Sequence, residues 1–436
     1  MSAIYQRPAE LSQNLIRFNT TNPPGDEAAC VNYIQQLLQE AGIESKIYAR
    51  DPYRPNLVAR LKGRGDAPPL LLQGHVDVVT TENQKWTHPP FEAKIVDGFI
   101  WGRGALDMKG AVAMMLSAFL RAKIENANLP GDVILTILSD EEAGGNFGAK
   151  YLVENHADLF KDVRYALGEF GGFNLQIGKQ SFYPIMIAEK QICWLKIILR
   201  GPAGHGSMPI RGGAMAKLGR VLARLDQNLL PVHITPSARA MVQGIVEGSP
   251  LFNRMLLSQL LNPLFTDRIL NLLGERGKLF VPLFRNTVNA TLVRGGDKIN
   301  VIPSEIMIEL DGRMLPGFNP EDMIREVRDV IGDEGEIEMV RHDPGPAEPN
   351  MGLFDTLVRA LREMDSTVLP IPLLLVAVTD ARFFSRLGIQ TYGFTPMQLP
   401  PDMNFSQTIH AADERIPVEA VGFGAEAIFK VLRSFK

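Results

Sequence analysis

The residues best suited to chemistry follow short apolar segments of the chain. His75 and Asp77 come directly after Leu70-Leu71-Leu72, a run that predicts a buried strand. Side chains two residues apart on a strand share a face, so the Asp77 carboxylate could accept the second N–H of the His75 imidazole. That pairing is typical of a metal-binding histidine, although a lone histidine at a strand end is more often structural.

Carboxylates recur at the same position after two later apolar segments. Glu141 and Glu142 follow Val133 to Leu138, and Glu169 follows Val163 to Leu167. Charged side chains are rarely left partly buried without a partner, so these groups indicate a nearby cation; a solvated acidic turn is the alternative. Imidazole and carboxylate together suit a divalent metal such as zinc. Strand alternation would send one glutamate toward the metal and the other toward water.

Helical and strand patterns alternate around these groups, which is typical of an α/β layer. Helical spacing predicts helices at 8–18, 26–41, 111–121, 351–364 and 418–432. Strands are predicted at 43–48, 56–61, 70–72, 133–138 and 163–167, and a hairpin around Asp97-Gly98 is predicted at 95–101.

A second pattern lies between the two parts of this layer. Strands at 189–200, 285–294, 304–314 and 335–341, with helices at 213–225 and 320–331, give the order βαββαβ of a ferredoxin-like sandwich. We therefore expect a catalytic domain at 1–188 and 346–436, and an inserted domain at 189–345. A leucine-rich insert at about 229–284 predicts an extra helical layer.

Composition narrows the class of partner. The 45 basic and 49 acidic residues give a net charge of −4 without a basic run, which does not favour nucleic acid. The two cysteines are far apart, so neither a disulfide framework nor a thiolate zinc site is indicated. The start lacks a signal-peptide pattern and no apolar run reaches about 18 residues, so we expect a cytoplasmic protein with no membrane partner.

The candidate groups lie in five short segments, which are Gly74 to Asp77, Gly102 to Gly110, Asp140 to Glu142, Glu169, and Ile409 to His410. In this order they resemble the signature segments of the M20 family of co-catalytic zinc peptidases and amidohydrolases. The family includes aminoacylase-1, glutamate carboxypeptidase, carboxypeptidase S and the succinyl-diaminopimelate and acetylornithine deacylases. The resemblance implies a mixed-sheet zinc-exopeptidase catalytic domain with an inserted ferredoxin-like lid or dimerisation domain.

The resemblance also implies a centre with two Zn²⁺ ions, for which Co²⁺ or Mn²⁺ could substitute. Asp107 would bridge both ions, and the peptide bond after it would be cis. The other ligands would be His75 and Glu169 for one ion, and Glu142 and His410 for the other. Glu141 would be the general base for a water shared by the metals, and Asp77 the partner of His75.

Four further residues gain roles from the same resemblance. In the lid, His205 would stabilise the oxyanion, often from the neighbouring subunit of a homodimer, and Asn289 would lie near the substrate. Arg313 would bind the substrate carboxylate, a task suited to a planar guanidinium. Thr379 begins a Thr-Asp-Ala loop that lines the substrate pocket. The residues before it, Val376-Ala377-Val378, replace glycines common in the family and predict a more apolar wall.

Together these features predict a metal-dependent hydrolase that releases an amino acid with a free carboxylate from an N-acyl amino acid or short peptide. A biosynthetic deacylase of the succinyl-diaminopimelate or acetylornithine type is the alternative within the family. A non-catalytic binding protein on the same fold is the alternative from another class; it predicts loss of a ligand or of Glu141, and none is missing. No Gly-x-Ser-x-Gly segment supports a serine hydrolase.

Overall fold

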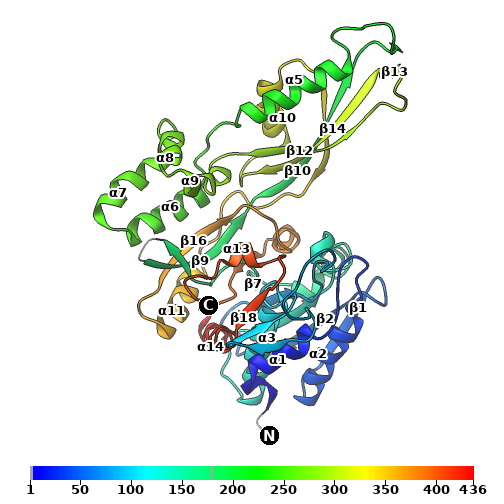
Figure 1. Cartoon of the computed structure of the whole chain (residues 1–436). Helices are drawn as coiled ribbons and strands as arrows, with labels where there is room; N and C mark the ends of the chain where they lie inside the picture. The colour runs from blue at the N-terminus through cyan, green and yellow to red at the C-terminus, as the bar shows by residue number, and fades with distance from the viewer. Residues whose placement is uncertain (1–2, 178–179) are drawn as a thin grey trace. The chain divides into compact units, whose positions relative to one another are not determined.

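The computed structural model describes residues 3–177 and 180–436, and the chain divides into two compact units (Figure 1). The first unit comprises Met1–Ile187, Asn350–Leu373 and Thr379–Lys436; the second comprises Ala188–Pro349 and Leu374–Val378. The domain limits placed from the sequence after residues 188 and 345 stay a prediction. The short segment Leu374–Val378 also belongs to the second unit, and the chain returns to the first unit at Thr379.

A mixed sheet organises the first unit. Its strand order is β1 (Ser45–Ala49), β2 (Pro55–Leu61), β6 (Val133–Leu138), β3 (Leu70–His75), β7 (Tyr165–Gly168), β17 (Gln390–Gly393), β9 (Gln180–Glu189) and β16 (Leu369–Leu375), with β8 (Leu175–Ile177) paired to β9. The central strands β6, β3, β7 and β17 run parallel to one another. This arrangement confirms the predicted mixed α/β class.

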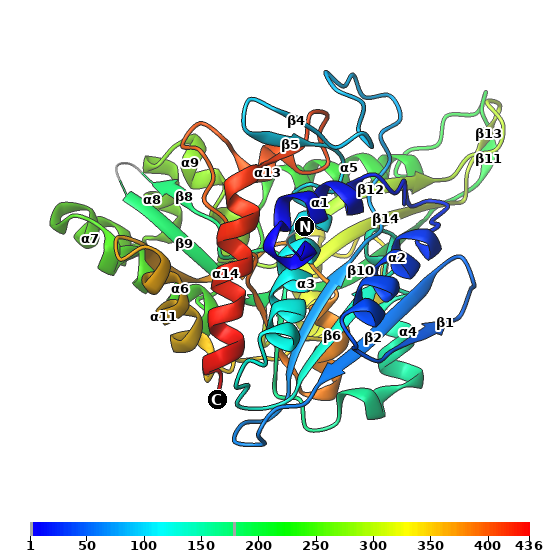
Figure 2. The ribbon, with the colours of Figure 1, turned by 90° about the horizontal axis from the view of Figure 1, so that it is seen from below.

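Helices cover both faces of this sheet. On one face α3 (Lys109–Ile124) packs with α1 (Pro8–Ile16) and α14 (Val418–Ser434), and Figure 2 shows the three side by side. On the other face Leu71 and Ile134 pack with Leu152 of α4 (Ala149–Asn155) and Phe384 of α12 (Ala381–Phe384). Because α3 lies between the sheet and other helices, it is apolar nearly all round.

The remaining elements of the first unit are short or peripheral. A three-stranded sheet has the order β18 (Arg415–Pro417), β5 (Phe99–Trp101), β4 (Lys94–Val96). The other helices are α2 (Ala28–Glu40), α11 (Phe354–Met364) and α13 (Phe405–Thr408), and the 3-10 turns are η1 (Ile4–Gln6), η2 (Glu141–Ala143), η3 (Ala157–Phe160) and η6 (Ser385–Leu387).

The second unit contains the predicted ferredoxin-like sandwich. Along the chain come β10 (Gln191–Arg200), α5 (Ala214–Gln227), β12 (Thr287–Arg294), β14 (Glu305–Met314), α10 (Pro320–Ile331) and β15 (Glu336–His342). The sheet order is β12-β14-β10-β15, and all pairs are antiparallel. Its core alternates along β10, where Leu195, Ile197 and Leu199 pack toward Met323 and Val327 of α10. A small ribbon pairs β11 (Gly204–His205) with β13 (Val301–Ile302).

The leucine-rich insert is helical, as its composition predicts. It contains α6 (Pro236–Gly248), α7 (Leu251–Ser258), η4 (Gln259–Leu261), α8 (Thr266–Leu272), α9 (Glu275–Lys278) and η5 (Val281–Leu283).

The sequence patterns did not predict β9, which contains Pro184. Proline cannot donate to a strand ladder and so weakens a strand pattern. In the part of the chain that the structure describes, no helix combines the length and apolar character needed to cross a membrane.

Lys190 lies in the turn between β9 and β10 and predicts a pH dependence of stability. Its buried Nζ donates to the carbonyl of Arg285 and the hydroxyl of Thr287, both at 3.0 Å. Burial, with the nearby charge of Arg313, lowers the pKa of Lys190 from 10.5 to about 7. The unfolded chain therefore binds more protons between pH 7 and about 10, so the free energy of unfolding rises with pH across that window.

We expect Lys190→Met to remove this rise in urea unfolding measured at several pH values. The exposed Lys85→Met is the matched control and should keep the slope of the parent protein. A Lys190→Met variant with the parent slope would contradict the assignment.

Candidate metal centre

The acidic and imidazole groups come together where parallel strands end. His75 is the last residue of β3, Glu141 and Glu142 follow β6, and Glu169 follows β7. Because β6, β3 and β7 are parallel neighbours, their carboxyl ends meet at one edge of the sheet. Residues that directly follow these strands in the sequence therefore lie close to one another in space.

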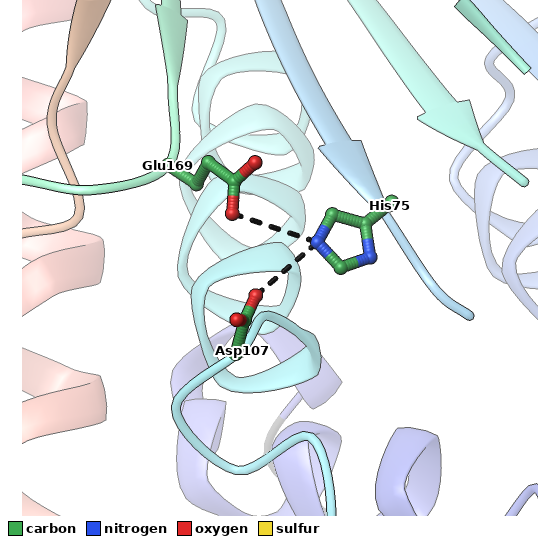
Figure 3. A group of neighbouring side chains, drawn as sticks. All are labelled: His75, Asp107 and Glu169. Atoms are coloured by element: carbon green, nitrogen blue, oxygen red, sulfur yellow. Dashed lines mark ion pairs between the residues drawn. The ribbon is translucent and has the colours of Figure 1, made fainter. Parts of the chain in front are cut away.

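The first group of ligand atoms joins His75, Asp107 and Glu169. His75 Nε2 lies 3.3 Å from Asp107 Oδ1 and 3.6 Å from Glu169 Oε2. Figure 3 shows the three side chains pointing toward one another, with Asp107 supplied by the segment before α3. All three are buried, and together they form a candidate metal site.

The second group uses the other oxygen of the same aspartate. His410 Nε2 lies 3.2 Å from Asp107 Oδ2 and 3.3 Å from Glu142 Oε1. Asp107, Glu142 and His410 form another candidate metal site. Since Asp107 belongs to both groups and turns one oxygen to each histidine, the structure has the form of two adjacent sites joined by one carboxylate.

The donor atoms fit metal ions. Two ligands at about 2.0 to 2.2 Å from a tetrahedral zinc ion lie about 3.3 to 3.6 Å apart, which matches the distances above. Among the described residues, His75 Nε2 and Glu142 Oε1 are buried and have no hydrogen-bond partner. Buried polar atoms are normally satisfied, so an imidazole nitrogen that faces two carboxylates and a carboxylate oxygen that faces an imidazole, both without a partner, support a cation in each group.

Burial and mutual charge shift the pKa values of the residues in these two groups. Burial, reinforced by the charge of Asp107, raises the pKa of Glu142 to about 8, and burial also raises the pKa of Glu169 well above its usual range. The nearby carboxylates of Asp107 and Glu142 raise the pKa of His410 to about 10. Metal binding must displace protons from such groups, which couples metal affinity to pH.

Asp77 links the first histidine to the two glutamates. Its Oδ1 lies 3.4 Å from His75 Nδ1, and the same ring nitrogen is 3.1 Å from the Asp77 carbonyl. Its carboxylate also accepts the backbone N–H groups of Glu141 and Glu142, each at 3.1 Å. Asp77 therefore orients the imidazole and anchors the turn that carries the glutamates.

The prediction that strand alternation separates the two glutamates is wrong. Asp140 has a left-handed backbone, with φ at 70°, and Glu141 and Glu142 lie on the 3-10 turn η2. Asp140 ends the strand geometry, so the turn, anchored by Asp77, directs the two side chains.

A buried ion-pair network supports this turn. Arg54 makes two hydrogen bonds with Glu27, at 2.9 and 3.1 Å, and its Nη2 lies 3.1 Å from Asp140 Oδ1. Asn22 donates to Asp77 at 2.8 Å and to Asp140 at 3.2 Å. One guanidinium and one amide thus bind three buried carboxylates, those of Glu27, Asp77 and Asp140.

Glu141 stands next to the ligand residue Glu142 in the chain and lies near Arg382. It belongs to neither ligand group, and Arg382 Nη1 of α12 lies 3.9 Å from its Oε1. Burial raises the pKa of Glu141, and the Arg382 charge opposes this rise. Thr379 is buried just before α12 and accepts the backbone N–H of Ala381 through its hydroxyl.

The peptide bond between Asp107 and Met108 is cis, as predicted. The three residues predicted for the lid belong to the second unit. His205 lies on β11 with Nδ1 2.7 Å from the Ser207 hydroxyl, and Asn289 is exposed on β12. Arg313 on β14 forms a two-point ion pair with Asp311, at 2.9 and 3.2 Å.

Sequence reasoning did not assign roles to Asn22, Arg54 or Arg382. Arg54 and Asn22 stand far along the chain from the signature segments, and no spacing rule connects them to Asp140. Arg382 follows Thr379-Asp380 and could have been noticed as a charge entering the apolar segment Ala381 to Phe384.

The mixed sheet, the lid-type sandwich and two carboxylate-linked ligand groups together define a metal-dependent hydrolase architecture. Residues 71–434 match the family described as Peptidase family M20/M25/M40, and the chain belongs to this family. The family model describes peptidases and the relatives include aminoacylase-1, so the chain is a hydrolase that acts on amide bonds.

Relatives span several activities within the family. The chain is 30% identical over 383 residues to a probable carboxypeptidase S-like 2 of Dictyostelium discoideum, covering 84% of this chain and 71% of that protein. It is 27% identical to an N-fatty-acyl-amino acid synthase/hydrolase of Homo sapiens, covering 84% and 74%. It is 26% identical to aminoacylase-1 of Sus scrofa, covering 93% and 89%.

Solved structures share the fold. A metallo-carboxypeptidase of Sulfolobus solfataricus superposes with a TM-score of 0.66 at 17% identity, covering 98% of each chain. A dinuclear metal-binding peptidase of Bacillus subtilis superposes with a TM-score of 0.62 at 15% identity, covering 99% of this chain and 98% of that one.

Proposed function

We propose that the chain hydrolyses the amide bond of an N-acyl amino acid or short peptide and releases an amino acid with a free carboxylate. The observation that carries this proposal is the pair of ligand groups joined by Asp107, with the separate carboxylate of Glu141 beside them. Similarity to carboxypeptidase S-like and aminoacylase proteins supports the same substrate class.

The proposed cofactor is a pair of Zn²⁺ ions, with Co²⁺ or Mn²⁺ as substitutes. His75, Glu169 and Asp107 would hold one ion, and Glu142, His410 and Asp107 the other. When bound, the ions would supply Lewis-acid polarisation of the scissile carbonyl and a lowered pKa for the attacking water.

The chain's own groups would move the proton. Glu141 would take a proton from the attacking water at Oε1 or Oε2 and deliver it to the departing amine nitrogen. Its burial and raised pKa suit this exchange, because a base should hold the proton between the two steps. Asp77 would keep His75 oriented throughout.

The remaining roles lie with the second unit and the Thr379 loop. We propose that His205 stabilises the oxyanion, that Asn289 and Thr379 contact the substrate, and that Arg313 holds the substrate carboxylate. Arg313 pairs with Asp311 through Nε and Nη2, which leaves the N–H groups of Nη1 to bind a ligand.

Arg313→Lys should therefore raise KM about 10- to 100-fold, because a charge-assisted hydrogen bond contributes about 1.5 to 3 kcal/mol. The effect should disappear with a substrate amidated at its carboxylate. Arg341→Lys is a matched control, since Arg341 forms the same two-point pair with Asp343 in the second unit. Equal effects of the two variants would remove Arg313 from the carboxylate role.

A panel of N-acetyl amino acids, long-chain N-acyl amino acids, dipeptides and N-succinyl-diaminopimelate tests the proposal. Hydrolysis that requires a free carboxylate and is lost with a chelator supports it. Preference for the diamino substrate would favour the deacylase alternative. An intact, metal-loaded protein that turns over none of them would favour the binding protein. Homodimerisation and a cytoplasmic location stay predictions.

A further inference from the structure

Two buried charged residues outside both ligand groups cross-connect the segments that carry Asp107 and His410. We propose that Arg103 and Glu414 act as positioning residues, which hold Asp107 and His410 at a fixed separation. They would thereby set the metal affinity of the group Asp107, Glu142 and His410. The inference rests on the metal centre proposed above.

Glu414 binds the segment that leads to Asp107. Its Oε1 accepts the backbone N–H groups of Leu106 at 2.7 Å and Asp107 at 3.1 Å. Its Oε2 accepts the N–H of Gly104 at 3.1 Å and Arg103 Nη1 at 2.7 Å. The side chain is fully buried, so these four donors replace its hydration. The backbone position of the bridging aspartate therefore depends directly on this carboxylate.

Arg103 binds the opposite segment. It donates to the carbonyl of His410 and to the carbonyl of Ala411, each at 3.2 Å. It also donates to Gln84 Oε1 at 2.8 Å, and Gln84 in turn donates to the His410 carbonyl at 2.8 Å. The guanidinium lies over the Trp86 ring and is buried. The backbone position of His410 thus depends on Arg103 and Gln84.

The connection is reciprocal. Arg103 comes from the Asp107 segment and binds the His410 segment, whereas Glu414 comes from the His410 segment and binds the Asp107 segment. Neither ligand can shift without disturbing the same buried ion pair, so the distance between Asp107 and His410 is coupled to it.

The two ligand groups differ in how much they need such support. His75 lies on a central strand and is buried, with Asp77 against its ring. His410 lies in a loop, has a left-handed backbone with φ at 60°, and its side chain is 49% exposed. A non-glycine residue in that conformation persists when its surroundings hold it there. Loss of the ion pair should therefore weaken metal binding by the His410 group more than by the His75 group.

The test measures binding of Zn²⁺ and Co²⁺ to the full chain by equilibrium dialysis and calorimetry. Glu414→Gln keeps the shape of the side chain and removes its charge. We expect its Kd for one metal equivalent to rise about 10- to 100-fold while the other equivalent changes much less. Glu326→Gln is the matched control, because Glu326 is a buried carboxylate with imidazole and amide partners in the second unit.

A double-variant comparison separates positioning from general support of the fold. In a His410→Ala background, which removes one ligand of the affected group, Glu414→Gln should change the remaining metal equivalent much less than it changes the His410 group of the parent. In a His75→Ala background it should still weaken binding. Equal weakening of both equivalents by Glu414→Gln, or no weakening, would overturn the inference.

A milder variant covers the case in which Glu414→Gln does not fold. Gln84→Ala removes one hydrogen bond to the His410 carbonyl from a partly exposed position. It should raise the Kd of the same metal equivalent by a smaller factor and leave the unfolding temperature near that of the parent. A Gln84→Ala variant with unchanged affinity at both equivalents would count against the proposal. A parent protein that binds no metal would instead remove the proposed function itself.

Discussion

Glu141→Gln should lower kcat about 10²- to 10⁴-fold and leave metal binding intact, because a positioned general base contributes an effect of that size. Glutamine keeps the volume of the side chain but cannot accept the proton of the attacking water. Glu141 belongs to neither ligand group, so both metal equivalents should remain bound. KM should change little if the substrate is held by other residues.

The neighbouring glutamate supplies the contrast. Glu142→Gln removes a ligand and should lose one metal equivalent together with activity. Metal analysis by atomic emission, alongside steady-state kinetics, distinguishes the two variants. Activity within a few-fold of the parent in metal-loaded Glu141→Gln would exclude this residue as the base.

Asp107→Asn should have the largest effect on metal content, because Asp107 supplies an oxygen to both ligand groups. The amide keeps the shape but lacks the negative charge that faces both histidines. We expect both metal equivalents to weaken, and kcat to fall more than about 10³-fold, since the ions supply several kcal/mol of transition-state stabilisation.

Dialysis against a metal buffer, followed by activity measurement at increasing Zn²⁺, tests this expectation. Asp66→Asn, which alters an exposed carboxylate paired with Arg64, is the control and should behave as the parent. Two tightly bound equivalents in Asp107→Asn would contradict a bridging role.

Several elements of the fold could be predicted because their patterns are local. The apolar runs of β3 and β6 and the helical spacing of α14 depend on neighbouring residues alone. The order βαββαβ also follows from local patterns. By contrast, β9 contains Pro184 and is made a strand by its pairing with β17, β16 and β8, which no local pattern reveals.

The candidate site also contains residues that could be predicted from the sequence and residues that could not. Its five candidate ligands could be proposed because each stands in a short signature segment, and the structure brings them into two groups. Arg54 could not be proposed, because its partners Glu27 and Asp140 are distant in sequence and meet it only in the folded first unit. Strand alternation was the wrong reason for the separation of Glu141 from Glu142, since a left-handed Asp140 converts the strand end into a turn.

The sequence by itself therefore determined the family, the fold class and the chemical types of the candidate metal ligands, because residue identity and spacing carry that information. Only the tertiary structure decided how Asp107 divides its two oxygens between His75 and His410, and which buried charges hold it there. The physical reason is that the energy of a buried charge depends on all its neighbours in space, and those neighbours come from segments as far apart as Arg103 and Glu414.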